Sequence, residues 1–107
     1  MAELIVAPSA RADLLAQWDF YADEVGDRNL ADRFVARAEA TFKKLARTPG
    51  LGRPRSFDSA KAKNLRSWKV ADFAKHLIFY RLLPDEQVVE VVRVLHGARD
   101  LDALLGK

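Results

Sequence analysis

Two histidines and a few arginines toward the C-terminal end are the residues whose chemistry stands out. His76 and His96 are 20 residues apart, and neither has the local spacing that makes a zinc motif specific. If the chain turns back near residues 85–86, His76 lies roughly opposite residue 95 and the two imidazole rings come close. Two histidines alone bind metal ions poorly, so we expect no metal site and no cofactor.

The common catalytic motifs are missing from the sequence. It has no GxxxxGKS/T or GxGxxG loop to bind phosphates, and no HExxH zinc motif. None of the serines lies in a GxSxG context that would expose it as a nucleophile. The sequence therefore predicts no catalytic centre of these classes.

Three arginines need an explanation. Arg81 and Arg93 lie within apolar segments, where a charge is unfavourable unless it is paired or faces a solvated groove. One interpretation is an ion-pair pin that joins the last strand to a closing helix through Arg93, Arg99 and Asp100. The other is an anion-binding cluster. The candidate acidic partners are Glu90, Asp100 and Asp102.

The segment that carries Arg93 and His96 is the clearest strand of the chain. Six of the nine residues from Val88 to His96 are Val or Leu, with almost no alternation. Such a run predicts a strand covered on both faces and central in its sheet. Residues 76–83 predict a second strand, joined to the first by a turn at 84–86 as a hairpin. Residues 98–105 predict a short closing helix that buries Leu101, Leu104 and Leu105.

Two helices are predicted before these strands. After a short strand over 3–7, Ser9 can cap a helix whose apolar positions fall on one face; these are Leu14, Leu15, Trp18, Tyr21, Ala22 and Val25. Gly26 can end that helix, and Asp27 or Asn29 can cap the next one. The second helix has an apolar face at Leu30, Phe34, Ala38, Phe42 and Leu45. The short connection makes the pair an antiparallel helical hairpin.

A loop over 51–63 and a strand over 65–70 complete the order. Strand, two helices, three strands and a helical tail indicate an α+β fold in a single domain over residues 1–107. The chain has no cysteine, and no apolar run approaches the roughly 20 residues of a membrane helix. The N-terminus does not resemble a signal peptide. We expect a cytoplasmic protein.

The net charge of +3 is unevenly distributed. Residues 1–27 carry a balance of −5, residues 28–75 a balance of +9, and residues 76–107 a balance of −1. The middle block can attract an acidic segment or nucleic acid. Alternatively, it forms a solvated face with ion pairs to the acidic first segment.

Two segments resemble a known family. HLIFYRLLPD at 76–85 and VVRVLHGARDLDALL at 91–105 resemble the C-terminal half of ParE toxins, in the ParE/RelE superfamily of toxin–antitoxin systems. The most specific part is RVLHGARDL, with the signature residues Arg93, His96, Gly97, Arg99 and Asp100. The resemblance implies a β-α-α-β-β-β(-α) fold, in which an antiparallel sheet packs against an N-terminal helical hairpin.

The resemblance also implies a function. ParE-like toxins poison DNA gyrase until a cognate antitoxin binds them. The partner would be a ParD-like ribbon-helix-helix protein with an acidic C-terminal tail, and operator DNA would be bound only through it. No membrane partner is implied. We expect the antitoxin or the target to contact a basic and aromatic set, namely Lys43, Lys44, Arg47, Arg53, Arg55, Arg66, Trp68 and Lys69.

The RelE branch of the superfamily offers an alternative, cleavage of messenger RNA on the ribosome. His96 would then move protons, and Lys69, Arg81 and Arg93 would contact phosphate. The tail after His96 contains no Tyr and no further His, so half of that apparatus is missing and we expect no catalytic residues. A second alternative is a non-toxic module that only binds its antitoxin and helps to repress the operon.

Overall fold

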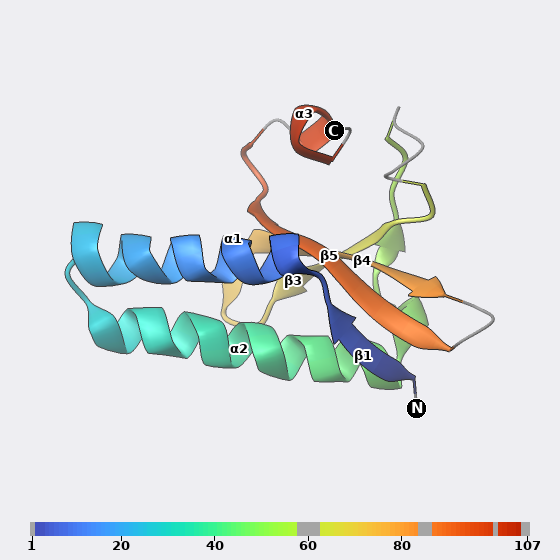
Figure 1. Cartoon of the computed structure of the whole chain (residues 1–107), viewed down its shortest axis with the longest axis horizontal. Coiled ribbons are helices and arrows are strands. Elements are labelled where there is room, and N and C mark those ends of the chain that lie inside the picture. The colour runs from blue at the N-terminus through green and yellow to red at the C-terminus, as the bar shows by residue number, and fades with distance from the viewer. Residues whose placement is uncertain (1, 58–62, 84–86, 100, 106–107) are drawn as a thin grey trace.

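The chain forms one mixed sheet with helices on both of its faces. A computed structural model describes residues 2–57, 63–83, 87–99 and 101–105. The strands are arranged in the order β1-β5-β4-β3-β2 (Figure 1). In chain order the elements are β1 (Glu3–Val6), α1 (Pro8–Asp19), η1 (Phe20–Glu24), α2 (Arg28–Arg47), η2 (Pro49–Leu51), β2 (Arg53–Pro54), β3 (Arg66–Val70), β4 (Phe73–Leu83), β5 (Val88–His96) and α3 (Leu101–Leu105).

The predicted element order and the α+β class are confirmed, but the sheet is not wholly antiparallel. β1 pairs in parallel with β5, from Glu3 opposite Val88 to Val6 opposite Val91. All other neighbouring strands are antiparallel. The pairing of β1 depends on where the helical hairpin returns the chain, and an apolar pattern carries no information on that direction. β5 lies between β1 and β4, as expected of a strand covered on both faces.

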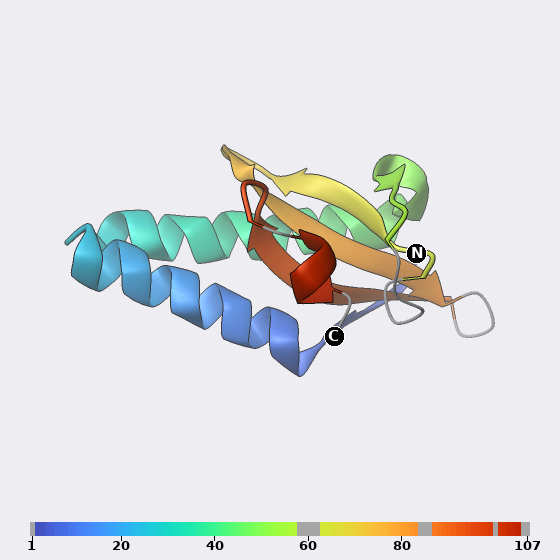
Figure 2. The ribbon, with the colours of Figure 1, turned by 90° about the horizontal axis from the view of Figure 1, so that it is seen from above.

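The helical hairpin of α1 and α2 covers one face of the sheet, and α3 covers the opposite face (Figures 1 and 2). The larger core lies under the hairpin and includes Phe34 and Phe42 of α2 with Ile78, Tyr80 and Val91 of the sheet. A smaller core lies under α3. It is formed by Leu65, Phe79, Leu95 and Leu105. Two cores on opposite faces explain why β4 and β5 are almost continuously apolar.

The second helix matches its prediction closely. The side chain of Asp27 accepts a hydrogen bond from the Leu30 N–H at 2.9 Å and caps α2. Gly26 has a φ of +78°, which glycine adopts without strain. Four of the five predicted apolar positions of α2 are buried, and Leu30 is half-buried.

The first helix departs from its prediction. It begins at Pro8 with Ala7 as its N-cap, since proline suits the first helical position. Ser9 is therefore not the cap, and its hydroxyl donates to the Val92 carbonyl at 2.8 Å. Of the predicted apolar face, Leu14 is buried but Leu15 is 63% exposed and Val25 is 51% exposed. The hairpin packs along a narrower stripe than the apolar spacing suggested.

The predicted loop over 51–63 contains a short edge strand. β2 pairs with β3 through Arg53 opposite Ser67 and Pro54 opposite Arg66. A strand of two residues that includes proline has no recognisable pattern. Residues 58–62 of the loop and the predicted turn at 84–86 lie outside the described residues.

One irregularity in the β4–β5 pairing affects the histidines. Tyr80 lies opposite Val91, whereas Phe79 lies opposite Arg93, so β5 contains one extra residue at this point. This β-bulge shifts the register of every later pair by one residue. His76 consequently lies opposite His96, one position beyond the predicted residue 95.

Candidate functional site

Ala7 and the first turns of α1 cover the edge of β5 where β1 ends. The Ala7 N–H donates to the Val91 carbonyl at 2.9 Å, and the Ser9 bond to Val92 lies one residue further on. The carboxylate of Asp13 then accepts the Val94 N–H at 2.9 Å. Backbone groups of an interior strand need hydrogen-bond partners. Beyond the end of β1, Ala7 and the side chains at the start of α1 supply these partners to β5.

Arg93 makes the most extensive ion pair among the described residues. Its Nε lies 2.8 Å from one oxygen of Asp13, and a terminal nitrogen lies 2.9 Å from the other. Its remaining nitrogen donates to the Leu104 carbonyl of α3 at 3.3 Å. The hydrogen bond with Asp13 raises the pKa of Arg93. Arg93 therefore ties β5 to α1 and α3.

This arrangement corrects the predicted partners of Arg93. Among the described residues, its carboxylate partner is Asp13 of the first helix, which was not one of the predicted candidates. Of those candidates, Asp100 and the side chain of Asp102 lie outside the described part of the chain. The predicted link to the closing helix exists through a backbone carbonyl instead. Among the signature residues, Arg99 is exposed and Asp100 lies outside the described residues. Glu90 does pair with Arg81, at 3.2 Å.

The two histidines are neighbours, as predicted, with ring centroids 5.3 Å apart. His76 is only 6% exposed, and its Nε2 lies 3.0 Å from the Tyr21 hydroxyl. Burial, and secondarily the charge of His96, lower the pKa of His76 to about 4. His76 is therefore neutral near pH 7 and belongs to the aromatic core around Tyr21 and Phe34.

His96 is the more accessible of the two. It is half-buried, and its Nδ1 accepts the Ala98 N–H at 3.1 Å. The neutral ring therefore carries its proton on Nε2. His96 borders a cavity of about 550 Å³ that Phe20 and Lys75 also line. The adjacent signature residue, Gly97, donates its N–H to the Lys75 carbonyl at 2.8 Å.

The four residues of the alternative nuclease site are not brought together. Cross-strand partners share a face of the sheet: Lys69 pairs with Leu77, and Leu77 packs on the α3 side. His96 is on the hairpin side with His76. Arg81 is five residues along β4 from His76, roughly 16 Å at the usual rise of a strand. Arg93 is already bound to Asp13.

No cluster of three or more His, Asp or Glu side chains in the described part of the chain could hold a metal ion. Within the same part, no helix is long and apolar enough to cross a membrane.

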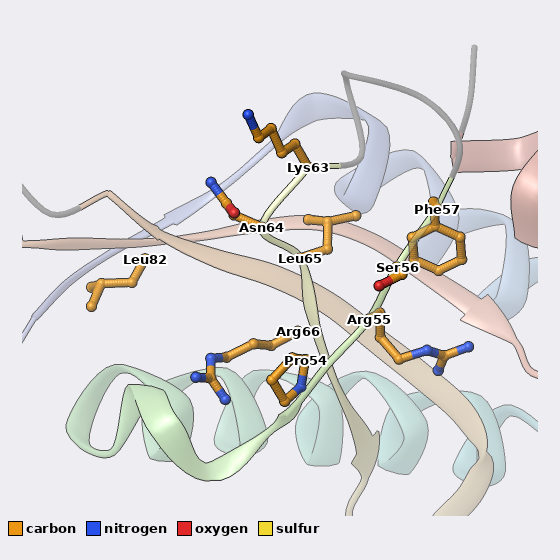
Figure 3. Close-up of a pocket in the computed structure, with 9 residues that line it drawn as sticks. All are labelled: Pro54, Arg55, Ser56, Phe57, Lys63, Asn64, Leu65, Arg66 and Leu82. Atoms are coloured by element: carbon orange, nitrogen blue, oxygen red, sulfur yellow. The ribbon is translucent and has the colours of Figure 1, made fainter.

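Six of the seven predicted basic residues fall into two groups. Lys43, Lys44 and Arg47 are exposed on the second half of α2. Arg53, Arg55 and Arg66 lie at the β2–β3 edge, where a groove of about 580 Å³ opens (Figure 3). We call it the basic groove. Its described lining residues are Pro54, Arg55, Ser56, Phe57, Lys63, Asn64, Leu65, Arg66 and Leu82.

The other two predicted contact residues lie on β3 beyond the reach of β2. Trp68 is half-buried against the larger core, and Lys69 is exposed. In the described part of the chain, the acidic first segment forms an ion pair through Asp13, and its partner Arg93 lies outside the basic middle block.

Comparison with known families identifies the chain. Residues 4–101 match the ParE toxin of the type II toxin–antitoxin system parDE. The chain belongs to the ParE toxin family. This confirms the resemblance that the signature segment suggested, over nearly the whole length of the chain.

Solved structures show the same fold as this ParE-family protein. The chromosomal ParDE toxin–antitoxin system from P. aeruginosa aligns with a TM-score of 0.71 at 20% identity, covering 90% of this chain and 96% of the other. The toxin–antitoxin complex RelBE2 from Mycobacterium tuberculosis gives 0.60 at 20% identity, with 92% and 93% covered. The isolated E. coli RelE toxin gives 0.54 at 15% identity, with 94% and 88% covered. No curated protein sequence matches significantly.

Sequence reasoning missed several residues of this ParE-family protein that organise the site. Asp13 is one of six acids in the first 27 residues, and nothing in its context distinguishes it from the others. The apolar spacing predicts Tyr21 in the core but gives no sign of its hydroxyl contact with His76. Phe57 and Lys63 of the basic groove were hidden in a segment without periodicity.

Proposed function

We propose that this ParE-family protein, as a single domain over residues 1–107, stops bacterial growth in the cytoplasm by binding and poisoning DNA gyrase. The family match over residues 4–101 carries the proposal. A binding toxin needs a stable surface rather than an assembled catalytic centre. Lys69, Arg81 and Arg93 are separated from His96, which supports inhibition by binding rather than by catalysis.

We also propose that a cognate ParD-like antitoxin neutralises the toxin. It would be a ribbon-helix-helix protein with an acidic tail, and it would bring the complex to operator DNA. Two solved relatives with the same fold are toxin–antitoxin complexes. β1 is at one edge of the sheet, and β2 covers only Arg66 and Ser67 of β3. Both edges offer backbone groups to an added strand.

The basic residues would supply electrostatic complementarity to an acidic partner. The contact set proposed for the antitoxin or the target comprises Lys43, Lys44, Arg47, Arg53, Arg55, Arg66, Trp68 and Lys69. Five of these residues are exposed (Lys43, Lys44, Arg47, Arg53 and Lys69), whereas Arg55, Arg66 and Trp68 are half-buried.

The test measures supercoiling by purified gyrase in the presence of the purified protein. We expect inhibition of supercoiling and accumulation of cleaved DNA, both reversed by adding the antitoxin. A heat-unfolded sample of the same preparation serves as the control. Unchanged supercoiling without any cleaved DNA would refute gyrase as the target.

A ribosome-dependent ribonuclease is the second candidate, favoured by one observation. Nε2 is the ring nitrogen of His96 that the Ala98 N–H leaves unengaged, and the half-buried ring borders a cavity, where Nε2 could exchange a proton with a substrate. This candidate predicts cut transcripts in a translation extract and their loss in His96→Asn. If His96→Asn keeps full growth inhibition and no transcript is cut, the candidate fails. Normal growth on induction without antitoxin would instead indicate a non-toxic binding module.

A further inference from the structure

The first helix carries a large apolar side chain that the fold leaves uncovered. Leu15 is 63% exposed, more than any other large apolar side chain in the described part of the chain. The helix α1 lies along one border of the molecule (Figure 2), so a second protein can approach it. A single exposed leucine is ordinary on a protein surface, and its surroundings therefore decide whether it belongs to a contact.

A groove of about 460 Å³ opens beside Leu15, at the seam between α1 and α2. We call it the hairpin groove; it is lined by Arg11, Leu14, Leu15, Trp18, Val35 and Glu39. Leu14 is buried, and Trp18 and Val35 are half-buried, so the floor of the groove is apolar. The Trp18 Nε1–H donates to the Asp32 carboxylate at 2.9 Å, which fixes the indole ring as one wall. A preformed apolar groove of this kind suits an aliphatic side chain.

Two charged side chains flank Leu15 along the same ridge of α1. Arg11 lies four residues before it and Asp19 four residues after it, and residues at this spacing follow one another along a helix surface. Arg11 and Asp19 are both exposed. Among the described residues, neither side chain forms an ion pair within the molecule. The ridge thus presents a cation, a leucine and an anion in this order, and both charges are available to a second molecule.

This order is self-complementary when two copies of α1 run antiparallel. In a two-fold symmetric contact, the same surface patch of each copy meets that of the other. With Leu15 next to the symmetry axis, Arg11 of one copy lies beside Asp19 of the other, and the same pair forms again at the opposite end. Ridges of four-residue spacing interdigitate at a crossing angle of about −50°, the commonest helix packing. A wholly acidic or wholly basic partner would instead be repelled by one of the two flanking charges.

We propose that the protein forms a symmetric dimer in which Leu15 of each copy packs on the hairpin groove of the other, flanked by two ion pairs between Arg11 and Asp19. One helix and one seam from each copy make a small interface, below about 1,200 Å² in total. Such an interface gives weak and reversible association, with a Kd on the order of 10–100 µM. Exposed ion pairs contribute little affinity, so the apolar contact supplies most of it and the charges set the orientation.

Sedimentation equilibrium of the purified protein, from about 5 µM to about 500 µM, measures the association. The weight-average mass should rise from that of a monomer toward that of a dimer over this range. Leu15→Asp should weaken the association by about tenfold or more. The matched control, Leu82→Asp, makes the same change at another exposed leucine, on β4, and should stay within about twofold of the parent protein. Circular dichroism checks that both variants fold.

Charge reversals test the antiparallel arrangement. Arg11→Asp places two carboxylates side by side at each end of the contact, and Asp19→Arg places two guanidinium groups there. Each variant alone should associate about fivefold more weakly or worse. The double variant Arg11→Asp with Asp19→Arg should return to within about twofold of the parent protein. An equimolar mixture of the two single variants should also associate like the parent, because each carboxylate then meets a guanidinium. Arg47→Asp makes the same charge change at an exposed position near the end of α2 and should have no effect.

Several results would overturn the proposal. A protein that stays monomeric over the whole concentration range has no such interface. Leu15→Asp or single reversals that associate like the parent protein would exclude this ridge from the contact. A double variant as weak as the single variants would exclude the antiparallel pairing of Arg11 with Asp19. The measurement needs neither gyrase nor an antitoxin, so its outcome is independent of the proposed function.

Discussion

Replacing His76 by glutamine should make the stability of the protein less sensitive to acid. The pKa of His76 is lowered from 6.5 to about 4 in the folded chain, so the unfolded state binds a proton more readily between those values. Above pH 6.5 the histidine is neutral in both states and does not lower the free energy of unfolding. As the pH falls from 6.5 toward 4, the unfolded state takes up the proton first, and the free energy of unfolding decreases. With 1.36 kcal/mol per pKa unit, the histidine contributes a loss of about 2 kcal/mol between pH 7 and pH 5.

Urea unfolding at pH 7 and at pH 5 measures this loss. The window ends at pH 5 because most carboxylates remain ionised there. The parent protein should lose about 2 kcal/mol more than His76→Gln over that interval. His96→Gln is the control: it should keep most of the loss, because burial is the larger cause of the lowered pKa. Identical pH dependence in the parent and His76→Gln would refute this account of the buried ring.

Two further predictions concern contacts that hold the sheet. Arg93→Ala should destabilise the fold by about 1–3 kcal/mol, because it leaves the carboxylate of Asp13 without its main partner. Combining it with Asp13→Ala in a double-mutant cycle of urea unfolding should reveal positive coupling, and strict additivity would contradict the pairing. Gly52→Ala should destabilise by about 2 kcal/mol, since the new Cβ would lie 2.5 Å from the Tyr80 hydroxyl oxygen. Gly50→Ala, with nothing within 4 Å, is its control and should melt like the parent protein.

Local features of the fold could be predicted from the sequence because short-range physics decides them. The cap at Asp27 and the four-residue spacing from Phe34 onward define α2 without any tertiary information. The apolar run from Val88 to His96 defines β5 equally well. The exposure of Leu15 could not be predicted, because it depends on which side of α1 packs against the sheet and on how many of its residues this contact buries.

The candidate site was less predictable, because its contacts span long stretches of chain. Arg93 was recognised as a charge that needs a partner, yet that partner is 80 residues earlier in the sequence. The basic groove depends on β2, whose two residues have no pattern of their own. Lys63 and Leu82 both line this groove because the chain at Lys63 leads into β3, which is adjacent to β4.

The single extra residue in β5 decides which side chains belong to which half of the molecule. A strand alternates its side chains between faces, yet Val91 and Val94 both pack under the hairpin, three positions apart. Because of the bulge between them, the even-numbered residues of β5 from Val94 onward face the hairpin, whereas before the bulge an odd-numbered residue, Val91, faces it. The change extends to the signature residue His96. If the strand continued from Val91 without the bulge, Leu95 would lie opposite His76 and His96 would turn to the side of the smaller core. Deleting Val92, the residue that has no partner opposite, should instead remove the bulge and leave the pairs Phe79–Arg93 and His76–His96 in place. The face on which each signature residue lies therefore depends on the bulge as much as on the identity of the residue.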